Sequence, residues 1–183
     1  MAAVARPWAR DLLYVWFERL GPSDWFGGVE KVDDLLARRF EHVLHAMGSQ
    51  PAYDFLGDRT IARAAILLFD QVSRNLYRDR AQAFAWDDLA LSLTHAALRR
   101  GWLTGLSRSE KQFLLMPLMH SEAIFDQELS LRLFARHVPG SLGFAKAHHR
   151  MIARFGRFPH RNEALGRTST EAEKRAVAAG FSW

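Results

Sequence analysis

Cysteine is absent from this chain of 183 residues, which excludes disulfide bonds, thiolate nucleophiles and zinc sites with cysteine ligands. The absence fits a reducing compartment, so we expect a cytoplasmic protein. Long apolar runs are also missing: the longest covers only residues 64–69, far below the roughly 20 residues that span a bilayer. The first 20 residues lack the apolar core of a signal peptide, and no membrane association is expected.

Charge of one sign is never concentrated. The net charge is +5, but 20 acidic residues are interspersed with 25 basic ones, and the glycine–aromatic signatures of RNA-binding modules are missing. Nucleic-acid binding is therefore not expected. Neither a glycine-rich phosphate loop, nor a dinucleotide fingerprint, nor a serine nucleophile elbow occurs, so no cofactor is predicted.

Metal-ligand spacings are equally scarce. His148 and His149 are adjacent and cannot share a helix face, and no Glu-x-x-His pattern follows Glu122. No metal site is predicted, although His120, Glu122 and His160 could still converge in space.

Apolar residues make up 49% of the chain and recur with helical spacing almost throughout. The pattern, with its Gly, Pro, Ser and Thr boundaries, predicts helices over about 9–18, 32–47, 60–77, 81–100, 107–117, 121–138, 142–155 and 170–179. No segment alternates with the period of a strand. The sequence thus predicts an all-α fold of seven to eight helices in antiparallel hairpins, forming one domain over residues 1–183.

A first polar cluster covers residues 70–78, at the end of the most apolar helix. On a regular helix its side chains fall within one arc of roughly 140°; they are Asp70, Gln71, Arg74, Asn75 and Arg78. Two interpretations stay open. The cluster is either a solvated face with an Asp70–Arg74 ion pair or the wall of a cleft.

A second cluster joins His120 and Glu122 to Asp126. On the predicted helix both carboxylates continue an apolar stripe, and a buried carboxylate without a partner costs several kcal/mol. We therefore expect both to pack against Arg157 and Arg161. His120 could carry a proton, although a structural hydrogen bond is the more usual role of a lone histidine.

The third cluster is the segment Arg154–Asn162, where three arginines, His160 and Asn162 surround Gly156 and Pro159. Arginine presents a planar fork of donors that fits carboxylate or phosphate. The alternative is that Arg154, Arg157 and Arg161 only neutralise the acids of the other two clusters.

These clusters carry a family resemblance. Residues 70–78, Pro117 to Glu122, Asp126 to Glu128, and Arg154 to Asn162 with Leu165 to Arg167 resemble the bacterial DUF924 family over essentially the whole chain. The resemblance implies an all-α architecture similar to tetratricopeptide-like helical arrays. Because this is a family of unknown function, it assigns no catalytic residue.

Two functional hypotheses follow. In the favoured one, the protein is a binding module with an arginine-rich polar cleft for an anionic peptide or partner; the candidate ligand-binding residues are Asp70, Gln71, Arg74, Asn75, Asp126, Arg157, Arg161 and Asn162. The alternative is an enzyme acting on a small carboxylate or phosphate in the same cleft, with His120, Glu122 and His160 as catalytic candidates. A closed pocket with buried carboxylates favours the enzyme, and an open groove with exposed aromatic rings favours the binding module.

Overall fold

The computed structural model describes residues 6–27 and 29–180. Its α-helices are α1 (Pro7–Tyr14), α2 (Pro22–Phe26), α3 (Glu30–Met47), α4 (Arg59–Leu67), α5 (Ser73–Leu76), α6 (Asp87–Arg99), α7 (Arg108–His120), α8 (Ile124–His137), α9 (Leu142–Phe155) and α10 (Glu171–Ala178). Eight of them have at least seven residues, and no strand occurs in the described ranges. The all-α prediction of seven to eight helices is confirmed.

Shorter helical segments complete the chain. Four are 3-10 helices: η2 (Ala52–Phe55), η4 (Ala81–Phe84), η5 (Pro139–Ser141) and η6 (Pro159–Arg161). Two are π-helical turns: η1 (Val15–Arg19), which extends α1, and η3 (Leu68–Val72), which joins α4 to α5. Residues 59–76 therefore form one continuous helix with a π-turn in its middle.

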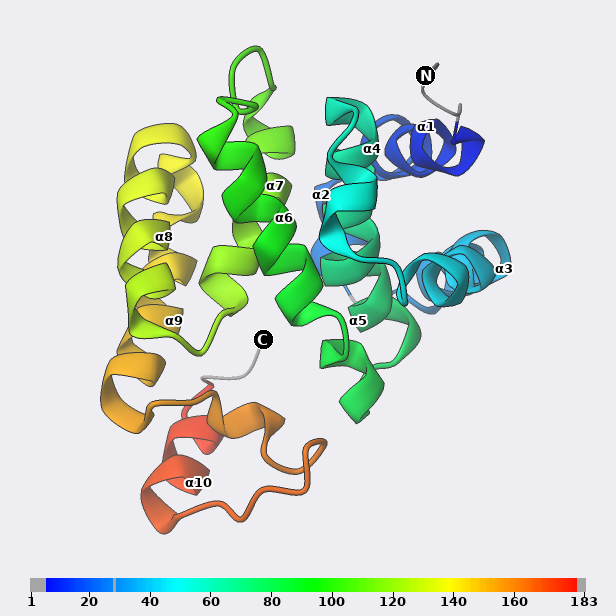
Figure 1. The fold of residues 1–183 in the computed structure, drawn as a ribbon. Coiled ribbons are helices and arrows are strands. Elements are labelled where there is room, and N and C mark those ends of the chain that lie inside the picture. Colours follow the sequence, from blue (N-terminus) through cyan, green and yellow to red (C-terminus); the bar gives the residue numbers. More distant parts are fainter. Residues whose placement is uncertain (1–5, 28, 181–183) are drawn as a thin grey trace.

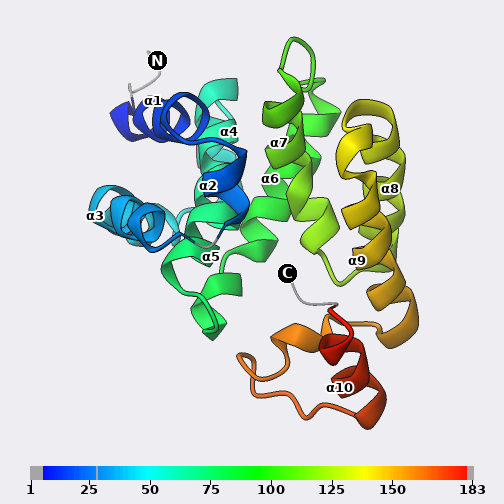
Figure 2. The ribbon, with the colours of Figure 1, turned by 180° about the vertical axis from the view of Figure 1, so that it is seen from behind.

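The helices pack in pairs set side by side in a row (Figure 1). α8 packs against both α7 and α9, α6 joins α7 to α4, and α1 and α3 cover the far side of the 59–76 helix. The chain then turns after α9, and the segment 156–180 with α10 lies across one end of the row (Figure 2). The tetratricopeptide-like geometry of this row stays a prediction.

The core runs through most of the row. α4 lies in its centre, as its nearly uniform apolar character predicts, with Ala64, Ala65 and Ile66 buried. The rings of Trp16 and Phe113 meet edge to face, with centroids 5.3 Å apart. A second, smaller cluster holds the C-terminal segment against α9; it consists of Met151, Ile152, Phe158 and Ala176.

Two helix limits differ from the prediction. α6 begins at Asp87 rather than at residue 81, because residues 81–84 form the separate 3-10 turn η4. α7 does not end at Pro117 but continues to His120. Pro117 lies inside α7, where it removes the backbone hydrogen bond that an amide at this position would donate to the Phe113 carbonyl.

The start of α8 also differs. Ala123 is the residue before the helix, so Glu122 lies in the α7–α8 loop and not on the expected helical stripe. Ser121 shapes this loop: its Oγ accepts a hydrogen bond from the Ala123 amide at 3.1 Å and donates one to Asp126 Oδ2 at 2.7 Å. The loop thereby frees Glu122 to face the C-terminal segment.

Candidate functional site

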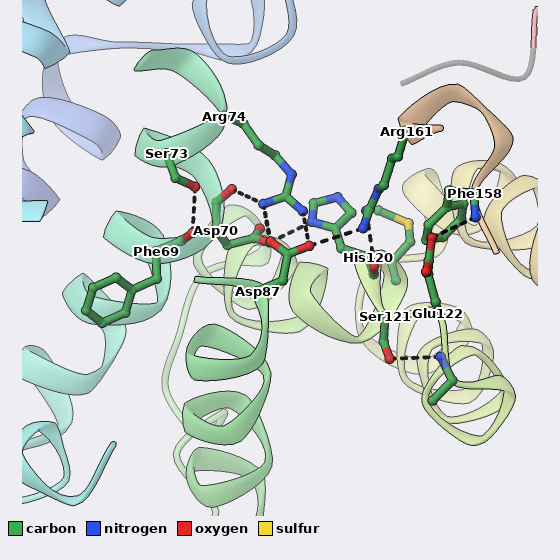
Figure 3. A network of polar contacts seen from close by, with 12 residues as sticks. Phe69, Asp70, Ser73, Arg74, Asp87, His120, Ser121, Glu122, Phe158 and Arg161 are labelled. Carbon is green, nitrogen blue, oxygen red and sulfur yellow. Dashed lines mark hydrogen bonds and ion pairs between the residues drawn. The ribbon is translucent and has the colours of Figure 1, made fainter. Parts of the chain in front are cut away.

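A cavity of about 250 Å³ lies where the ends of several helices meet the C-terminal segment. Its walls come from η3, η4, the first turns of α6, the end of α7 and the residues that follow Pro159; Figure 3 shows the polar network at its edge. The lining residues are Asp70, Phe84, Asp87, Asp88, Leu91, Pro117, His120, Ser121, Glu122, Arg161, Leu165 and Arg167. We refer to this cavity as the polar pocket.

Asp70 reaches the polar pocket from the π-turn η3. Such turns bond residue i to i+5 instead of i+4, and in proteins they occur frequently at functional sites. The side chain of Asp70 is only 1% exposed, so its charge depends on partners within the protein. Helical periodicity alone does not reveal this turn.

The carboxylate of Asp70 has three side-chain partners. Its Oδ1 lies 2.6 Å from Nδ1 of His120 and 3.3 Å from Nη1 of Arg74, and its Oδ2 accepts a hydrogen bond from Gln71 at 2.6 Å. Burial alone would raise the pKa of Asp70, but His120, Arg74 and Gln71 outweigh it and hold the pKa at about 2. Asp70 is therefore ionised at neutral pH.

His120 is the neutral partner of this pair. Burial lowers the pKa of the imidazole, and the charges of Arg74 and Arg161 add to the effect, which exceeds the attraction of Asp70. Because an ionised carboxylate accepts only, Nδ1 carries the proton and Nε2 keeps its lone pair. No hydrogen bond joins Nε2 to any residue that the structure describes.

Arg161 closes the pocket from the C-terminal segment. Its guanidinium pairs with Asp87 Oδ2 at 3.1 Å and donates to the His120 carbonyl at 3.1 Å. The same group lies between the rings of Phe84 and Phe158, at 4.7 and 4.5 Å from their centroids. Burial lowers the pKa of Arg161 to about 10, so the group remains charged at neutral pH.

Asp87 connects two arginines of the site. Its carboxylate lies 2.9 Å from Nη1 of Arg74 and 3.1 Å from Nη1 of Arg161 (Figure 3). Arg74 itself lies behind the pocket wall, between Asp70 and Asp87. The first polar cluster of the sequence is thereby joined to the third through an acid that the sequence had not singled out.

The predicted partner of Glu122 is wrong. Instead of Arg157 or Arg161, Nη1 of Arg167 contacts both carboxylate oxygens at 2.9 and 3.0 Å, and the Phe158 amide donates to Oε1 at 2.9 Å. Burial raises the pKa of Glu122, but these donors outweigh it and lower the pKa below its ordinary value. The expected contact between Glu122 and the C-terminal segment does exist, through a different arginine.

Arg157 and Asp126 also have other partners than expected. Arg157 forms a two-point ion pair with Glu173 of α10, at 2.7 and 3.0 Å, and it lies outside the pocket wall. Asp126 bonds to Nε2 of His95 at 2.8 Å and to Ser121. The expected ion pair between Asp126 and an arginine is wrong, because His95 of α6 and Ser121 contact its two carboxylate oxygens instead.

Three further candidates lie away from the pocket wall. Asn75 donates to Asp33 of α3 at 2.7 Å, whereas its neighbour Arg74 contacts Asp87 of α6. Asn162 donates to Ser169 Oγ at 3.0 Å inside the C-terminal segment, and His160 packs against Phe158. Of the predicted site residues, the structure brings Asp70, His120, Glu122 and Arg161 together at the pocket.

Several residues of the pocket lining have no distinguishing mark in the sequence. Asp87 and Asp88 resemble ordinary acidic residues of a first helical turn, where they offset the helix dipole. Phe84 and Leu91 have no mark that separates them from core residues. Arg167 has such a mark, because it belongs to a segment that resembles the family, but its contact with Glu122 depends on the fold.

Within 6–27 and 29–180, no group of three or more His, Cys, Asp or Glu side chains is placed to hold a metal ion. No helix in these ranges combines the length and apolarity needed to cross a bilayer.

Comparison with known proteins agrees with this fold. The family described as bacterial protein of unknown function, DUF924, matches residues 12–180. The chain belongs to the DUF924 family. The resemblance carried by its sequence motifs is thereby confirmed.

A solved structure supports the same assignment. The chain is similar to the protein of unknown function ATU0120 from Agrobacterium tumefaciens, with 31% identity and a TM-score of 0.88. The similarity covers 94% of this chain and 97% of the other. No match is found among curated proteins.

Proposed function

We propose that this DUF924 protein is an enzyme that acts on a small molecule in the polar pocket, with His120 as general base. The observation that carries the proposal is the 2.6 Å contact between Nδ1 of His120 and the buried carboxylate of Asp70 at the pocket wall. Carboxylate–histidine pairs of this kind fix the imidazole tautomer and orientation in many enzymes. Asp70 acts here through His120 and is a positioning residue.

The protonation states suit a base. Because His120 is neutral at pH 7, its Nε2 can accept a proton from a bound hydroxyl, an acidic C–H group or a water molecule. The imidazolium so formed lies against Asp70, whose pKa of about 2 keeps it ionised throughout. The negative charge stabilises the protonated state without itself taking the proton.

The pocket also fits a small substrate. Since one water molecule takes about 30 Å³ in the liquid, a cavity of about 250 Å³ has the volume of about eight water molecules, which suits a small ligand. Arg161 and Arg167 face this space and can bind a carboxylate or phosphate. A cavity of this size with buried charges favours a small-molecule site over a peptide groove.

Binding of a peptide or protein partner is the second candidate. It is favoured by the exposed rings of Phe125 in α8 and Phe144 in α9, which are 79% and 58% exposed. Neither ring lines the polar pocket. A partner bound there would therefore use another surface than the one that holds the arginine cluster.

The test is an activity screen in which only the His120 variants lose turnover. The panel contains small carboxylate and phosphate esters, amides and epimerisable acids, assayed with the unmodified chain, His120→Ala, His120→Gln and the control His42→Ala on the exposed face of α3. A general base contributes about 10²- to 10⁴-fold to a rate. We expect losses of that size in both His120 variants and none in the control.

A second readout does not need a substrate. Diethyl pyrocarbonate acylates neutral, accessible imidazole nitrogens, and peptide mass spectrometry locates the adduct. We expect His120 to react at neutral pH and a pocket ligand to protect it. Turnover that survives both His120 substitutions, or a His120 that stays unmodified while His42 reacts, would contradict the proposed base.

A further inference from the structure

The charges of the polar pocket do not cancel. Four carboxylates line it: Asp70, Asp87, Asp88 and Glu122. Three guanidinium groups face these acids, two from the lining and the third from Arg74 behind the wall. With His120 neutral, the site holds one negative charge more than its own cations offset.

The excess charge can be assigned to Asp88. The other three carboxylates each contact at least one arginine, as described above. No hydrogen bond or ion pair joins the side chain of Asp88 to any residue in the described ranges, and the residue lies exposed at the pocket rim. The dipole of α6 stabilises the charge of Asp88 in the first helical turn. This role does not explain why Asp88 lies at the pocket.

Unused donors lie in the same pocket. Nε of Arg161 is buried and has no hydrogen-bond partner in the described chain, although the residue is only 6% exposed. Buried donors are almost always paired in folded proteins, and this unpaired one belongs to a residue that lines the pocket. Arg167 engages Glu122 through Nη1 alone, which leaves its other nitrogens available at a side chain that is about one third exposed.

We infer that the substrate of the polar pocket is a small zwitterion, with an ammonium group at Asp88 and a carboxylate or phosphate at Arg161 and Arg167. The inference rests on the proposed function, because it takes the pocket to be the substrate site. Phe84, Leu91 and Leu165 supply apolar wall between the charged groups and accommodate the carbon skeleton. A ligand with both charges satisfies the free acid and the free donors together, whereas a simple anion adds to an existing negative excess.

The experiment compares matched ligands by saturation-transfer NMR and calorimetry. The probes are the common amino acids and O-phosphoethanolamine, each beside one analogue that lacks the amine and one that lacks the acid; leucine, 4-methylpentanoate and 3-methylbutylamine form one such set. We expect at least one zwitterion to bind about tenfold or more tightly than both of its analogues, a difference of about 1.4 kcal/mol.

Variants of the pocket test where the ammonium group and the acidic group of the ligand bind. Asp88→Asn should weaken the zwitterion and abolish its advantage over the amine-free analogue, because the change removes both the partner of the ammonium group and the negative excess that opposes the anion. Arg167→Gln should weaken the zwitterion and the amine-free analogue together. Asp54→Asn, an exposed acid in η2 away from the pocket, serves as the control and should change neither.

Failure of this inference differs from failure of the proposed function. Three outcomes would each overturn the inference: equal affinity for the zwitterion and its amine-free analogue, unchanged zwitterion affinity in Asp88→Asn, or no binding by any probe. None of them would affect a His120-dependent activity found in the screen. Activity that survives His120→Ala would remove the proposed base whichever probe binds.

Discussion

Nδ1 of His120 lies 2.6 Å from Oδ1 of Asp70, across 50 positions of sequence. This contact joins the π-turn of the 59–76 helix to the end of α7, and the bond from Arg161 to the His120 carbonyl adds the C-terminal segment. The three polar clusters of the sequence thus meet at a single histidine.

Loss of the Asp70 carboxylate should destabilise the protein strongly. Asp70→Ala removes a buried charge that Arg74 and His120 both contact, and breaking such a pair typically costs about 3–5 kcal/mol. Asp70→Asn should cost less, because an amide oxygen still accepts from His120. Urea unfolding gives the free energies, with Glu128→Gln on the exposed face of α8 as control. An Asp70→Ala variant within 0.5 kcal/mol of the unmodified chain, roughly the effect of a surface change, would contradict the role of this pair.

Glu122 should be coupled energetically to Arg167 and not to Arg157. A double-mutant cycle with Glu122→Gln and Arg167→Gln should give a coupling energy of about 1 kcal/mol, since both side chains are about one third exposed and water screens the pair. The matched cycle with Arg157→Gln should show no measurable coupling, because Arg157 pairs with Glu173. Coupling between Glu122 and Arg157, with none between Glu122 and Arg167, would contradict this prediction.

Acid should destabilise the protein well before its carboxylates titrate. Burial lowers the pKa of His148 to about 3 and that of His160 to about 4, from 6.5. The unfolded chain therefore binds protons at these sites first, and stability falls as pH decreases below 6.5. The slope should approach 1.4 kcal/mol per pH unit for each histidine until its folded pKa is reached.

Urea midpoints between pH 7.5 and 4.5 test this slope. His148→Asn and His160→Asn should each flatten the curve, whereas His42→Asn, in an exposed position, should leave it unchanged. Stability that is constant from pH 6.5 to 4.5 would show that the two rings are protonated in the folded protein without penalty.

Gly156 should resist substitution because of its backbone. It ends α9 with φ at +69°, in the left-handed region, and a methyl group there would meet no neighbouring atom. Gly156→Ala should therefore cost about 1 kcal/mol from conformation alone. Gly143 in the first turn of α9 has equally free space and an ordinary φ, so Gly143→Ala should be neutral or stabilising by up to about 1 kcal/mol. Thermal unfolding of the two variants should shift in opposite directions; a shift of the same sign would contradict the conformational argument.

The sequence predicted those features that local rules determine. The limits of α9 follow from its apolar periodicity and from Gly156, and the capping box of Thr170 and Glu173 starts α10 as expected. Ser107 and Glu110 start α7 in the same way. Each of these depends on residues a few positions apart, so the necessary information lies within one window of sequence.

The features that the sequence did not predict depend on distant residues. Arg161 and Arg167 lie six positions apart and have the same chemistry, yet the first pairs with Asp87 and the second with Glu122. Their partners are decided by the path of the chain after Gly156, which periodicity does not describe. The π-turn is a similar case, because i+4 and i+5 bonding fit the same apolar run.

The π-turn η3 also sets the rotation of one half of the 59–76 helix against the other. Each residue of an α-helix turns the chain by about 100°, so one residue gained or lost in the middle rotates everything after it by that angle. Deletion of a single residue within 68–72 would leave the apolar half of this helix able to enter the core. Arg74 and Asn75 follow the π-turn in the chain. The deletion would therefore turn Arg74 away from Asp87 and Asn75 away from Asp33. A chain with this deletion could thus keep its core and still lose the rotational alignment on which the pocket is built.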